Sequence, residues 1–388
     1  MDSPFPIIDL IARILVFLLG AALVISVLNS AIRTFVLPRS AHDWLLMVVF
    51  KSSGMVFSLF TRRAKTYEER DQMMALYAPV TLIVLPAVWL LLVLIGYMAM
   101  FVTLGSKSLE SAFTVSGSSL LTLGFERQEG IIPLVLSFSE AAIGLILVAL
   151  LIAYLPTIYS AFSHRETAVT MLEVRAGSPP SAVELFVRFH NLKRLDKLTQ
   201  LWEQWETLFA ELEESHTSLA MLAFFRSPQS HRSWVTAAGA VLDAASLAES
   251  TVDIPPNPQA ALTIRAGYIA LQRIAAYFGV PYNANPTPTD PISVSRLEFD
   301  IACNYLAEKG VPLKADRDQA WRDYAGWRVN YDIPLLALCG ITMAPYAPWS
   351  SDRSLRKQRM LAKRLASRRG GTLPIEAIQE SLSPGPQL

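Results

Sequence analysis

Long uncharged apolar runs alternate with short polar connections over the first 165 residues, and shorter amphipathic patterns follow them. Three of the runs, residues 10–37, 78–104 and 133–162, are long enough to cross about 30 Å of hydrocarbon as helices. Beyond Glu166, apolar residues recur at intervals of three and four, which is typical of amphipathic helices. The pattern predicts an all-α membrane protein with three transmembrane helices and a helical C-terminal part.

A fourth apolar stretch, residues 44–60, is interrupted by polar residues and followed by a basic cluster. Residues 33–70 contain seven Lys/Arg, whereas residues 105–129 contain two, so the positive-inside rule puts the first connection in the cytoplasm. If residues 44–60 crossed the membrane, their basic cluster would lie on the opposite side. We therefore predict an interfacial helix there, with the N-terminus outside and the C-terminus inside.

The connection between the second and third runs carries the main functional signal. A Ser-rich, helix-like segment over residues 108–121 leads directly into Thr122-Leu123-Gly124-Phe125-Glu126. A membrane helix, a half-helix, a Thr-x-Gly-aromatic turn and a second membrane helix occur in this order in tetrameric cation-channel pores. Irregular backbone at membrane depth is tolerated only where protein or a water-filled cavity surrounds it. This predicted re-entrant loop is therefore a candidate ion site.

Residues 78–162 resemble the two-helix pore module of potassium channels, and the chain is similar to bacterial membrane proteins described as channel-like. The family filter reads Thr-Val-Gly-Tyr-Gly-Asp, and the matching segment here is Thr122-Leu123-Gly124-Phe125-Glu126-Arg127. The resemblance implies an ion-binding filter at Thr122, Leu123, Gly124 and Phe125, with Glu126 at the mouth, and monovalent cations such as potassium as the permeating ions. It also implies a homo-oligomer, most simply a tetramer.

Two positions depart from the family filter. Glycine serves there because alternate residues adopt left-handed backbone conformations that disfavour a Cβ, and Glu126 replaces the second glycine. Arg127 replaces the family aspartate. The outer half of the filter is therefore expected to differ from that of potassium channels and to discriminate weakly between potassium and sodium.

Several residues are candidates for supporting or moving such a pore. Glu140 is the single charge within residues 133–162. It is either a cation-facing group or a carboxyl that supports the filter through hydroxyls such as Ser116, Ser118 and Ser119, and we favour support. Gly144 and Pro156 lie where a hinge and a kink would let an inner helix bend.

The soluble part is predicted to contain helices over residues 181–215, 234–247, 259–278, 295–308 and 317–338. Ser295 and Glu298 have the spacing of a capping box. A basic tail with interleaved apolar residues begins near residue 351. Its charges favour anionic lipid over nucleic acid, while a merely solvated helix is equally compatible. The expected lipid-binding residues are Arg356, Lys357, Arg359, Lys363 and Arg364.

Composition supports the membrane assignment and narrows the chemistry. The chain is 52% hydrophobic and 17% charged, well below the charged fraction of about 25% in soluble proteins. A net charge of +1 disfavours a globally basic nucleic-acid binder. The five histidines and two cysteines lack metal-ligand spacing, and nucleotide-binding or catalytic motifs are absent from the sequence. We expect no enzyme activity, no metal and no cofactor.

The predicted organisation has five parts: a transmembrane helix in residues 1–40, an interfacial helix and linker in 41–75, a pore module in 76–165, a helical cytoplasmic domain in 166–350 and the tail in 351–388. The leading hypothesis is an oligomeric cation pore of the bacterial inner membrane, regulated by its cytoplasmic domain. The alternative is a non-conducting, membrane-anchored sensor or scaffold that keeps the pore fold for assembly.

Overall fold

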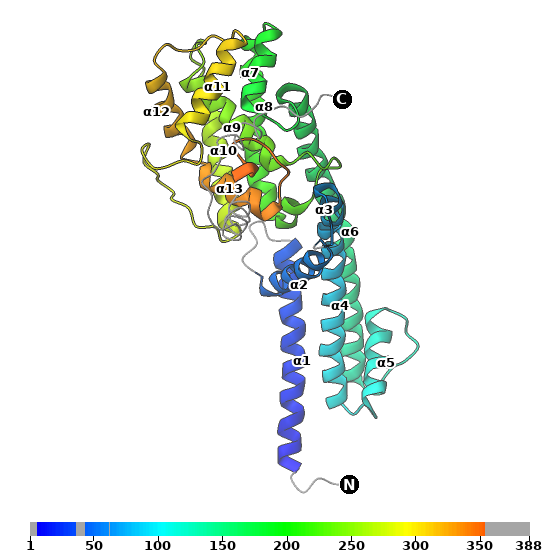
Figure 1. Cartoon of the computed structure of the whole chain (residues 1–388). Coiled ribbons are helices and arrows are strands. Elements are labelled where there is room, and N and C mark those ends of the chain that lie inside the picture. The colour runs from blue at the N-terminus through cyan, green and yellow to red at the C-terminus, as the bar shows by residue number, and fades with distance from the viewer. Residues whose placement is uncertain (1–5, 36–42, 62, 354–388) are drawn as a thin grey trace.

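The structure is a computed structural model that describes residues 6–35, 43–61 and 63–353. Within these ranges the chain is helical, apart from one isolated antiparallel pairing between Val252 and Leu313. The molecule is elongated, with parallel and antiparallel helices at one end and a cluster of shorter helices at the other (Figure 1). The predicted all-α class is confirmed.

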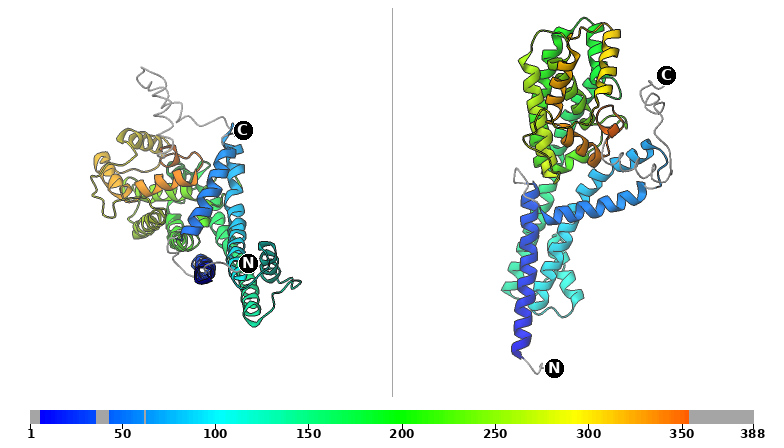
Figure 2. Two further views of the ribbon diagram at one scale, coloured as in Figure 1. Left: turned by 90° about the horizontal axis from the view of Figure 1, so that it is seen from below. Right: turned by 60° about the vertical axis from the view of Figure 1, so that its left-hand side comes forward.

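Four segments are long and apolar enough to cross a membrane, judged by length and composition: Ile7–Thr34, Trp44–Thr61, Tyr67–Thr103 and Ile131–Ala176. They correspond to α1 (Pro6–Phe35), α2 (Trp44–Thr61), α3 (Tyr67–Ala75) joined to α4 (Tyr77–Thr103), and α6 (Ile131–Ala176). The three predicted spans are among them, and α2 is the additional candidate. Whereas α1, α4 and α6 follow the long axis, α2 runs crosswise near the end of α1 (Figures 1 and 2).

Helix α1 touches α4 through a crossing of two glycines. A Cβ on Gly20 would lie 2.5 Å from the carbonyl oxygen of Gly96, so the absence of side chains lets the two backbones meet. Nearer the other end, the Trp89 indole donates to the Ser30 hydroxyl at 3.1 Å, and Ser30 also bonds the buried carboxyl of Asp43 just before α2. These contacts fix α1 and the start of α2 against α4.

The helices that follow α6 form what we call the C-terminal helical domain, residues 182–353. It contains α7 (Ala182–Asn191), α8 (Leu198–Ser218), α9 (Trp234–Ser250), α10 (Pro258–Tyr277), α11 (Arg296–Glu308), α12 (Arg317–Arg328) and α13 (Asp332–Thr342), with 3-10 turns η1 (Leu195–Lys197), η2 (Ala220–Phe224) and η3 (Ser351–Arg353). Almost every residue of α9 is buried, so this helix is the centre of the domain core.

Two predicted helices are each divided in the structure. The segment predicted as one helix over 181–215 breaks between α7 and α8, where Lys193 has a positive φ of 56° and Leu192 is 70% exposed. The segment predicted over 317–338 breaks between α12 and α13. Apolar spacing continues across both breaks, which is why periodicity alone does not reveal them. The capping box at Ser295 and Glu298 is confirmed at the start of α11.

Helix α6 has 46 residues and enters the domain without interruption. Val169, Leu172 and Ala176 at its end belong to the same core cluster as α9. The boundary predicted at residues 165 and 166 therefore lies inside a continuous helix. Helix α6 therefore connects the segment predicted as a pore module, residues 76–165, directly to the core of the C-terminal helical domain.

A buried ionic cluster anchors α12 and α13 on α9. The guanidinium of Arg328, which is 0% exposed, donates to Asp332 at 2.7 Å, to the Trp349 carbonyl at 2.6 Å and to Asp243. The hydroxyls of Tyr331 and Tyr324 also donate to Asp243, at 2.9 and 3.2 Å. The cluster is satisfied by both charge and hydrogen bonds, so removing its one cation leaves buried carboxylates without compensation.

We expect Arg328→Met to reduce the free energy of unfolding by about 3–5 kcal/mol, because breaking a buried pair is strongly destabilising. The control is Arg322→Met on the same helix, an exposed guanidinium that bonds only Gln319 one turn away. It should change the free energy by less than about 0.5 kcal/mol. Urea unfolding of the detergent-solubilised protein, followed by tryptophan fluorescence, measures both. Equal effects of the two substitutions would contradict the structural role of Arg328.

Candidate ion-pathway site

The half-helix α5 (Leu109–Leu120) comes between α4 and α6 in the chain and packs beside this helix pair, at the end of the molecule remote from the C-terminal helical domain (Figure 1). It starts where the Ser108 hydroxyl accepts the Ser111 N–H at 3.1 Å, a normal N-cap for a helix. On its buried face, the Ser116 hydroxyl lies 2.5 Å from a Glu140 carboxyl oxygen on α6 and 3.1 Å from the Leu94 carbonyl on α4. One serine thus joins all three helices.

Helix α5 runs in the same direction as α6. Ser116 faces Glu140, and one turn further on Leu120 faces Gly144: a Cβ on Gly144 would lie 2.3 Å from the Leu120 carbonyl oxygen. Gly144 follows the start of α6 at Ile131 by 13 positions, which is about 20 Å along a helix. The end of α5 therefore lies far from the ends of α4 and α6 that its loops connect, and residues 121–130 have to return over that distance.

Ser118 organises the turn that follows α5. Its carbonyl accepts the N–H groups of Leu123 at 2.8 Å and Gly124 at 3.3 Å, and its hydroxyl accepts the Glu126 N–H at 3.2 Å. Thr122 and Gly124 both have left-handed backbone conformations, with φ of 55° and 71°. Such a conformation is ordinary for glycine and strained for threonine. The strain at Thr122 is a feature that sequence reasoning did not predict.

The tip of this loop is exposed in the part of the chain that the structure describes. Leu121, Leu123 and Phe125 are 58%, 59% and 65% exposed, and no atom lies within 4 Å of the Cβ that Gly124 would carry. Large apolar side chains at three alternate positions of one loop form an exposed apolar patch, which is unusual on a surface that nothing covers. They indicate a surface that another body covers.

The predicted site residues differ in backbone conformation and in hydrogen-bond partners. The segment Thr122–Glu126 forms one continuous loop, as a filter requires. Glu126 is not among the described residues with a positive φ, so the second glycine position of the family filter has a different backbone here. Ser118 supports the loop, whereas the Ser119 hydroxyl donates to the Val115 carbonyl at 2.9 Å within its own helix. Glu140 contacts Ser116 and neither of these two serines.

Glu140 is enclosed between α4, α5 and α6, with no exposed surface. One of its carboxyl oxygens is bonded to Ser116, and the other has no partner among the described residues. The neighbouring Ser139 hydroxyl is 2.8 Å from the Tyr97 hydroxyl on α4. This placement suits a group that holds α5 in position rather than one that contacts a passing ion.

The expected hinge residues both lie inside α6. Gly144 has a packing reason to be glycine, because it admits the end of α5. Pro156 is inside the helix, which continues through it to Ala176. The expected lipid-binding residues of the tail, Arg356 to Arg364, lie outside the described residues.

The structure adds a link at Arg165 that the sequence did not reveal. This buried arginine on α6 donates to the Leu222 carbonyl at 2.9 Å and the Phe225 carbonyl at 2.7 Å, and it also pairs with Glu166 at 3.0 Å. His216 on α8 lies 3.2 Å from the same guanidinium. In the sequence Arg165 is only the first arginine after an apolar run, and its carbonyl partners are invisible there.

A second link joins α3 to the domain. Arg226 pairs with Asp71 and donates to the Thr342 carbonyl at 2.8 Å, while the Tyr67 hydroxyl donates to the Met343 carbonyl at 3.2 Å. Helix α3 leads directly into α4, so the domain holds the segments at both ends of the pore-like unit. Arg165 secures α6, and Arg226 secures the approach to α4.

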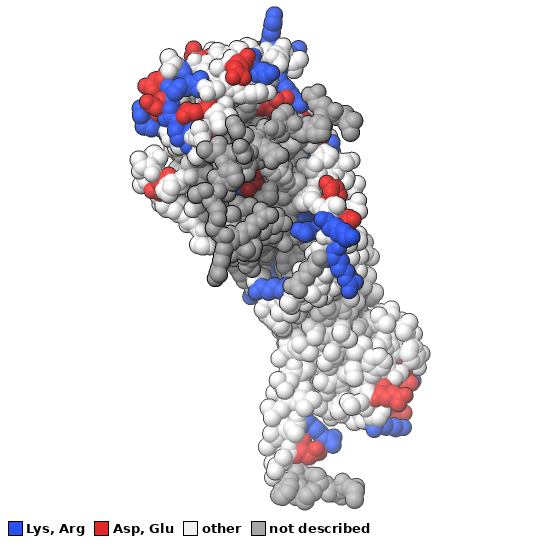
Figure 3. Space-filling model, in the orientation of Figure 1, with Lys and Arg blue, Asp and Glu red and all other residues white. Residues whose placement is uncertain are grey.

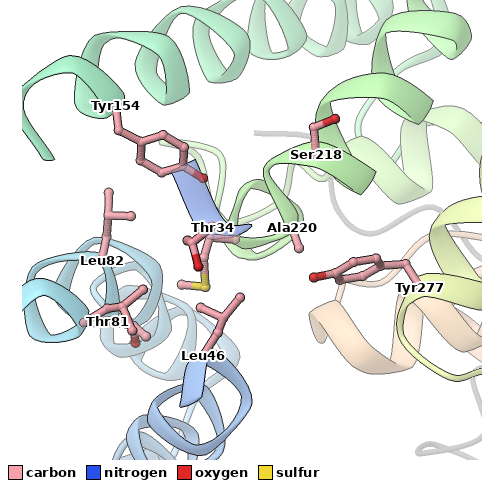
Figure 4. A pocket seen from close by; sticks show the side chains of 10 residues that line it. Thr34, Leu46, Thr81, Leu82, Tyr154, Ser218, Ala220 and Tyr277 are labelled. Atoms are coloured by element: carbon pink, nitrogen blue, oxygen red, sulfur yellow. The ribbon is translucent and has the colours of Figure 1, made fainter. Parts of the chain in front are cut away.

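Helices α1, α4 and α6 meet the C-terminal helical domain around a small cavity of about 20 Å³ (Figure 4). Tyr154 of α6 and Tyr277 of α10 point into it, and Thr34, Thr81 and Ser218 contribute hydroxyls from α1, α4 and α8. This volume has room for about one water molecule, and the wall offers several hydrogen-bonding groups. The Thr34 and Thr81 hydroxyls donate to carbonyls of their own helices, and most of the lining is apolar, so the joint between α6 and the domain is tightly packed and largely apolar.

Other chemistries find little support. Among the residues that the structure describes, no group of three or more His, Cys, Asp or Glu side chains is placed to hold a metal ion. Comparison with known proteins shows that no family model, no curated protein and no solved structure matches this chain. The function is therefore argued from the geometry of the loop and its supports.

The Arg165–His216 contact predicts a pH dependence of stability. Arginine only donates, so the His216 ring nitrogen facing it accepts and the ring is neutral. Burial, together with the Arg165 charge, lowers the pKa of His216 well below 6.5. Below about pH 6.5 the unfolded chain binds a proton at His216 that the folded chain does not, so stability is present above that pH and is lost as the pH falls.

We expect the thermal unfolding midpoint of the purified protein to fall as the pH is lowered from about 7 to 5, and His216→Gln to flatten this dependence. The slope with pH is the readout, whatever the midpoint of the variant. His190→Gln, at a half-buried histidine elsewhere in the domain, should keep the parent slope. If His216→Gln and His190→Gln show the same slope, His216 is not the titrating group.

Proposed function

We propose that this chain is one subunit of an oligomeric cation-conducting pore in a membrane. The observation that carries the proposal is the direction and depth of α5: it runs parallel to α6, and Leu120 meets Gly144 about 20 Å along that helix. In a bilayer with a hydrocarbon core of about 30 Å, such a half-helix ends near the middle. Non-helical backbone at that depth needs protein or water around it.

Further copies of the chain would supply the protein that surrounds this non-helical backbone. The loop tip is uncovered in one chain, and one loop cannot enclose an ion, so several loops have to converge on an axis. Closed rings are the usual form of homo-oligomers, and a fourfold ring is the simplest for a pore loop of this kind. In it Leu121, Leu123 and Phe125 would contact neighbouring subunits.

The electrostatics of the loop favour a cation. The C-terminal end of α5 is directed at the loop, and a helix C-terminus carries a partial negative charge equivalent to about half an electron. Backbone carbonyls of Thr122, Leu123 and Gly124 would replace part of the ion's hydration shell, and Glu126 would add a carboxylate ring at the mouth. Because Glu126 lacks the left-handed conformation that a glycine would provide, we propose weak discrimination between potassium and sodium.

The proposed topology has α1, α4 and α6 as spans, α2 in the cytoplasmic interface, and the helical domain in the cytoplasm of a bacterial cell. The crosswise course of α2 supports this assignment (Figure 2). Its exposed apolar residues include Trp44, Val48 and Met55, and Arg63 and Lys65 follow its end. An amphipathic helix with flanking basic residues is suited to the boundary between headgroups and acyl chains.

The alternative function is a non-conducting, membrane-anchored sensor or scaffold. Glu126 and Arg127 favour it, because charged residues replace the glycine and aspartate of the family filter. The left-handed Gly124 and the uncovered tip of the loop favour conduction. The two functions differ in what a change at Gly124 would disturb.

Gly124→Val tests the ion site. A β-branched residue is strongly disfavoured at a φ of 71°, so the substitution should abolish cation flux into proteoliposomes. The matched control is Gly279→Val in the C-terminal helical domain, where glycine has the same φ of 71° and also no atom within 4 Å of its Cβ position. It carries the same local strain at a distance from the loop and should leave the flux within about twofold of the parent.

Oligomer size, measured on the same preparations by light scattering, separates the two functions. For a pore, Gly124→Val should lose flux and keep the parent oligomer, since the spans and the helical domain are unchanged. For a scaffold, the parent shows no flux and Gly124→Val alters the oligomer. Parent-like flux through Gly124→Val would contradict the placement of the ion site in this loop.

Cysteine labelling tests the topology. The two native cysteines, Cys303 and Cys339, are first replaced by serine, so that a single introduced cysteine at an exposed position can be followed. Glu68→Cys on α3 and His164→Cys near the end of the apolar part of α6 should react with a membrane-impermeant maleimide only from the cytoplasmic side. Lys107→Cys, in the loop before α5, should react only from outside. Outside labelling of Glu68→Cys would show that α2 spans the membrane.

A further inference from the structure

A second cavity, remote from the pore loop, lies between α3 and the C-terminal helical domain. Its volume is about 790 Å³, within the range of about 300–1,000 Å³ that is usual for small-molecule sites. Its walls come from α3, the turn at 178–179 after α6, the loop at 230–231 before α9, and the segment from α13 to η3. It therefore borders both the helix that leads into α4 and the end of α6.

One wall of the cavity is apolar. Met343, Ala344, Pro345 and Tyr346 form it together with Cys339, which is buried and unpaired with any other cysteine. These residues follow one another from the last turn of α13 through a bend at Met343, whose φ is 51°. An uninterrupted apolar wall of this kind suits a hydrocarbon body.

The opposite wall carries Arg70 of α3. Its Nε atom is buried and has no hydrogen-bond partner among the described residues. The acidic neighbours on α3 do not compensate it: Asp71 pairs with Arg226, and Glu69 accepts the Lys65 N–H at 2.8 Å. Glu68 also lines the cavity, but its side chain is exposed and is two positions from Arg70, a spacing at which side chains of a helix do not face each other.

Two further features add polar contacts without adding negative charge. Ser178 and Ser230 line the cavity with hydroxyls. His231 also lines it and is 3.2 Å from Glu173, whose carboxylate is shared with Arg232. The cavity thus contains one guanidinium that no carboxylate bonds among the described residues, one exposed carboxylate at Glu68, several hydroxyls and an apolar wall.

We propose that this cavity binds an anionic amphiphile, with a carboxylate or phosphate head on Arg70 and an apolar body against Met343 and Ala344. Arginine is always charged and presents a planar fork that matches either head group through charge-assisted hydrogen bonds. Lys and Arg side chains gather on the surface at the level of α3 and the end of α2, which would attract such a ligand (Figure 3). The binding site does not depend on ion conduction.

Alkylation of Cys339 by N-ethylmaleimide reports on occupancy, because this thiol lines the cavity. Cys303 is the internal control: it is buried in α11 and does not line the cavity. Burial raises the thiol pKa of both cysteines, so the two alkylation rates are measured at the same alkaline pH. The probes for the full-length protein in detergent are octanoate, octanol as the uncharged chain, and inorganic phosphate as the charge without a chain. Mass spectrometry gives the rate at each cysteine.

Octanoate should slow alkylation of Cys339 and leave Cys303 unaffected, while octanol and phosphate have little effect at the same concentration. Arg70→Gln should raise the octanoate concentration for half-protection by about tenfold or more, as expected for a lost hydrogen bond to a charged group. Arg175→Gln, at an arginine that bonds only its own helix at Met171, should behave as the parent. The thermal midpoint, raised by octanoate in the parent and not in Arg70→Gln, gives a second readout.

Nanodiscs distinguish the two sources of such a ligand. Slower alkylation of Cys339 in phosphatidylglycerol than in phosphatidylcholine assigns the site to a lipid head group, and equal rates with retained octanoate protection assign it to a soluble amphiphile. Equal protection by octanol, an unchanged response in Arg70→Gln, or no effect of octanoate on either readout would overturn the proposal. So would a Cys339 that octanoate protects only after residues 354–388 are deleted, because the chain's own tail would then be the occupant.

Discussion

The close approach of α5 to α6 is the constraint on which the rest of the structure depends. Leu120 touches the backbone of α6 because residue 144 has no side chain, and the Ser116 hydroxyl links Glu140 to α4 one turn earlier. These two contacts set the direction of α5 and the depth at which it ends. The position of the loop, the exposure of its tip and the direction of the α5 C-terminus all follow from them.

The same helix that receives α5 also connects it to the C-terminal helical domain. Helix α6 has no break between Glu140 and Ala176, and its last turns are part of the domain core. Arg165 fixes the helix to η2 through two carbonyls, so a displacement of η2 would be transmitted along a packed rod. Arg226 fixes α3 in a comparable way. Regulation of the loop by the domain therefore needs no flexible linker.

Sequence reasoning located the elements of the pore-like unit closely. It predicted the half-helix over 108–121, and the structure has Leu109–Leu120 with Ser108 as its cap. It also predicted a helix over residues 44–60 from the apolar stretch there and the basic cluster that follows it. Uncharged runs and Ser caps are local signals, so they can be read along the chain. Glu140 as a support of α5 is compatible with the structure, although its partner is Ser116 and the support itself stays a prediction.

Other features depend on tertiary contacts and were out of reach. The breaks at Lys193 and between α12 and α13 fall within continuous apolar spacing, and the continuity of α6 is hidden by the change of composition at Glu166. The left-handed Thr122 donates its N–H to the Ser119 carbonyl, and the next two residues donate to the Ser118 carbonyl, contacts that the sequence alone does not show. The sequence around Arg165 and Arg328 gives no sign of burial, yet both are buried because carbonyls and carboxylates from other segments surround them.

The central claim is that cations pass through a ring of these loops. The most direct measurement is the reversal potential of the unmodified protein in planar bilayers, first across a tenfold gradient of potassium chloride, where its sign separates cation from anion current, and then with equal concentrations of potassium chloride on one side and sodium chloride on the other. We expect a cation current across the gradient and a reversal potential near zero between equal potassium and sodium concentrations, because Glu126 replaces the glycine that would complete a potassium filter. An anion current, a strongly potassium-selective current, or no current in a preparation shown to be oligomeric would contradict it.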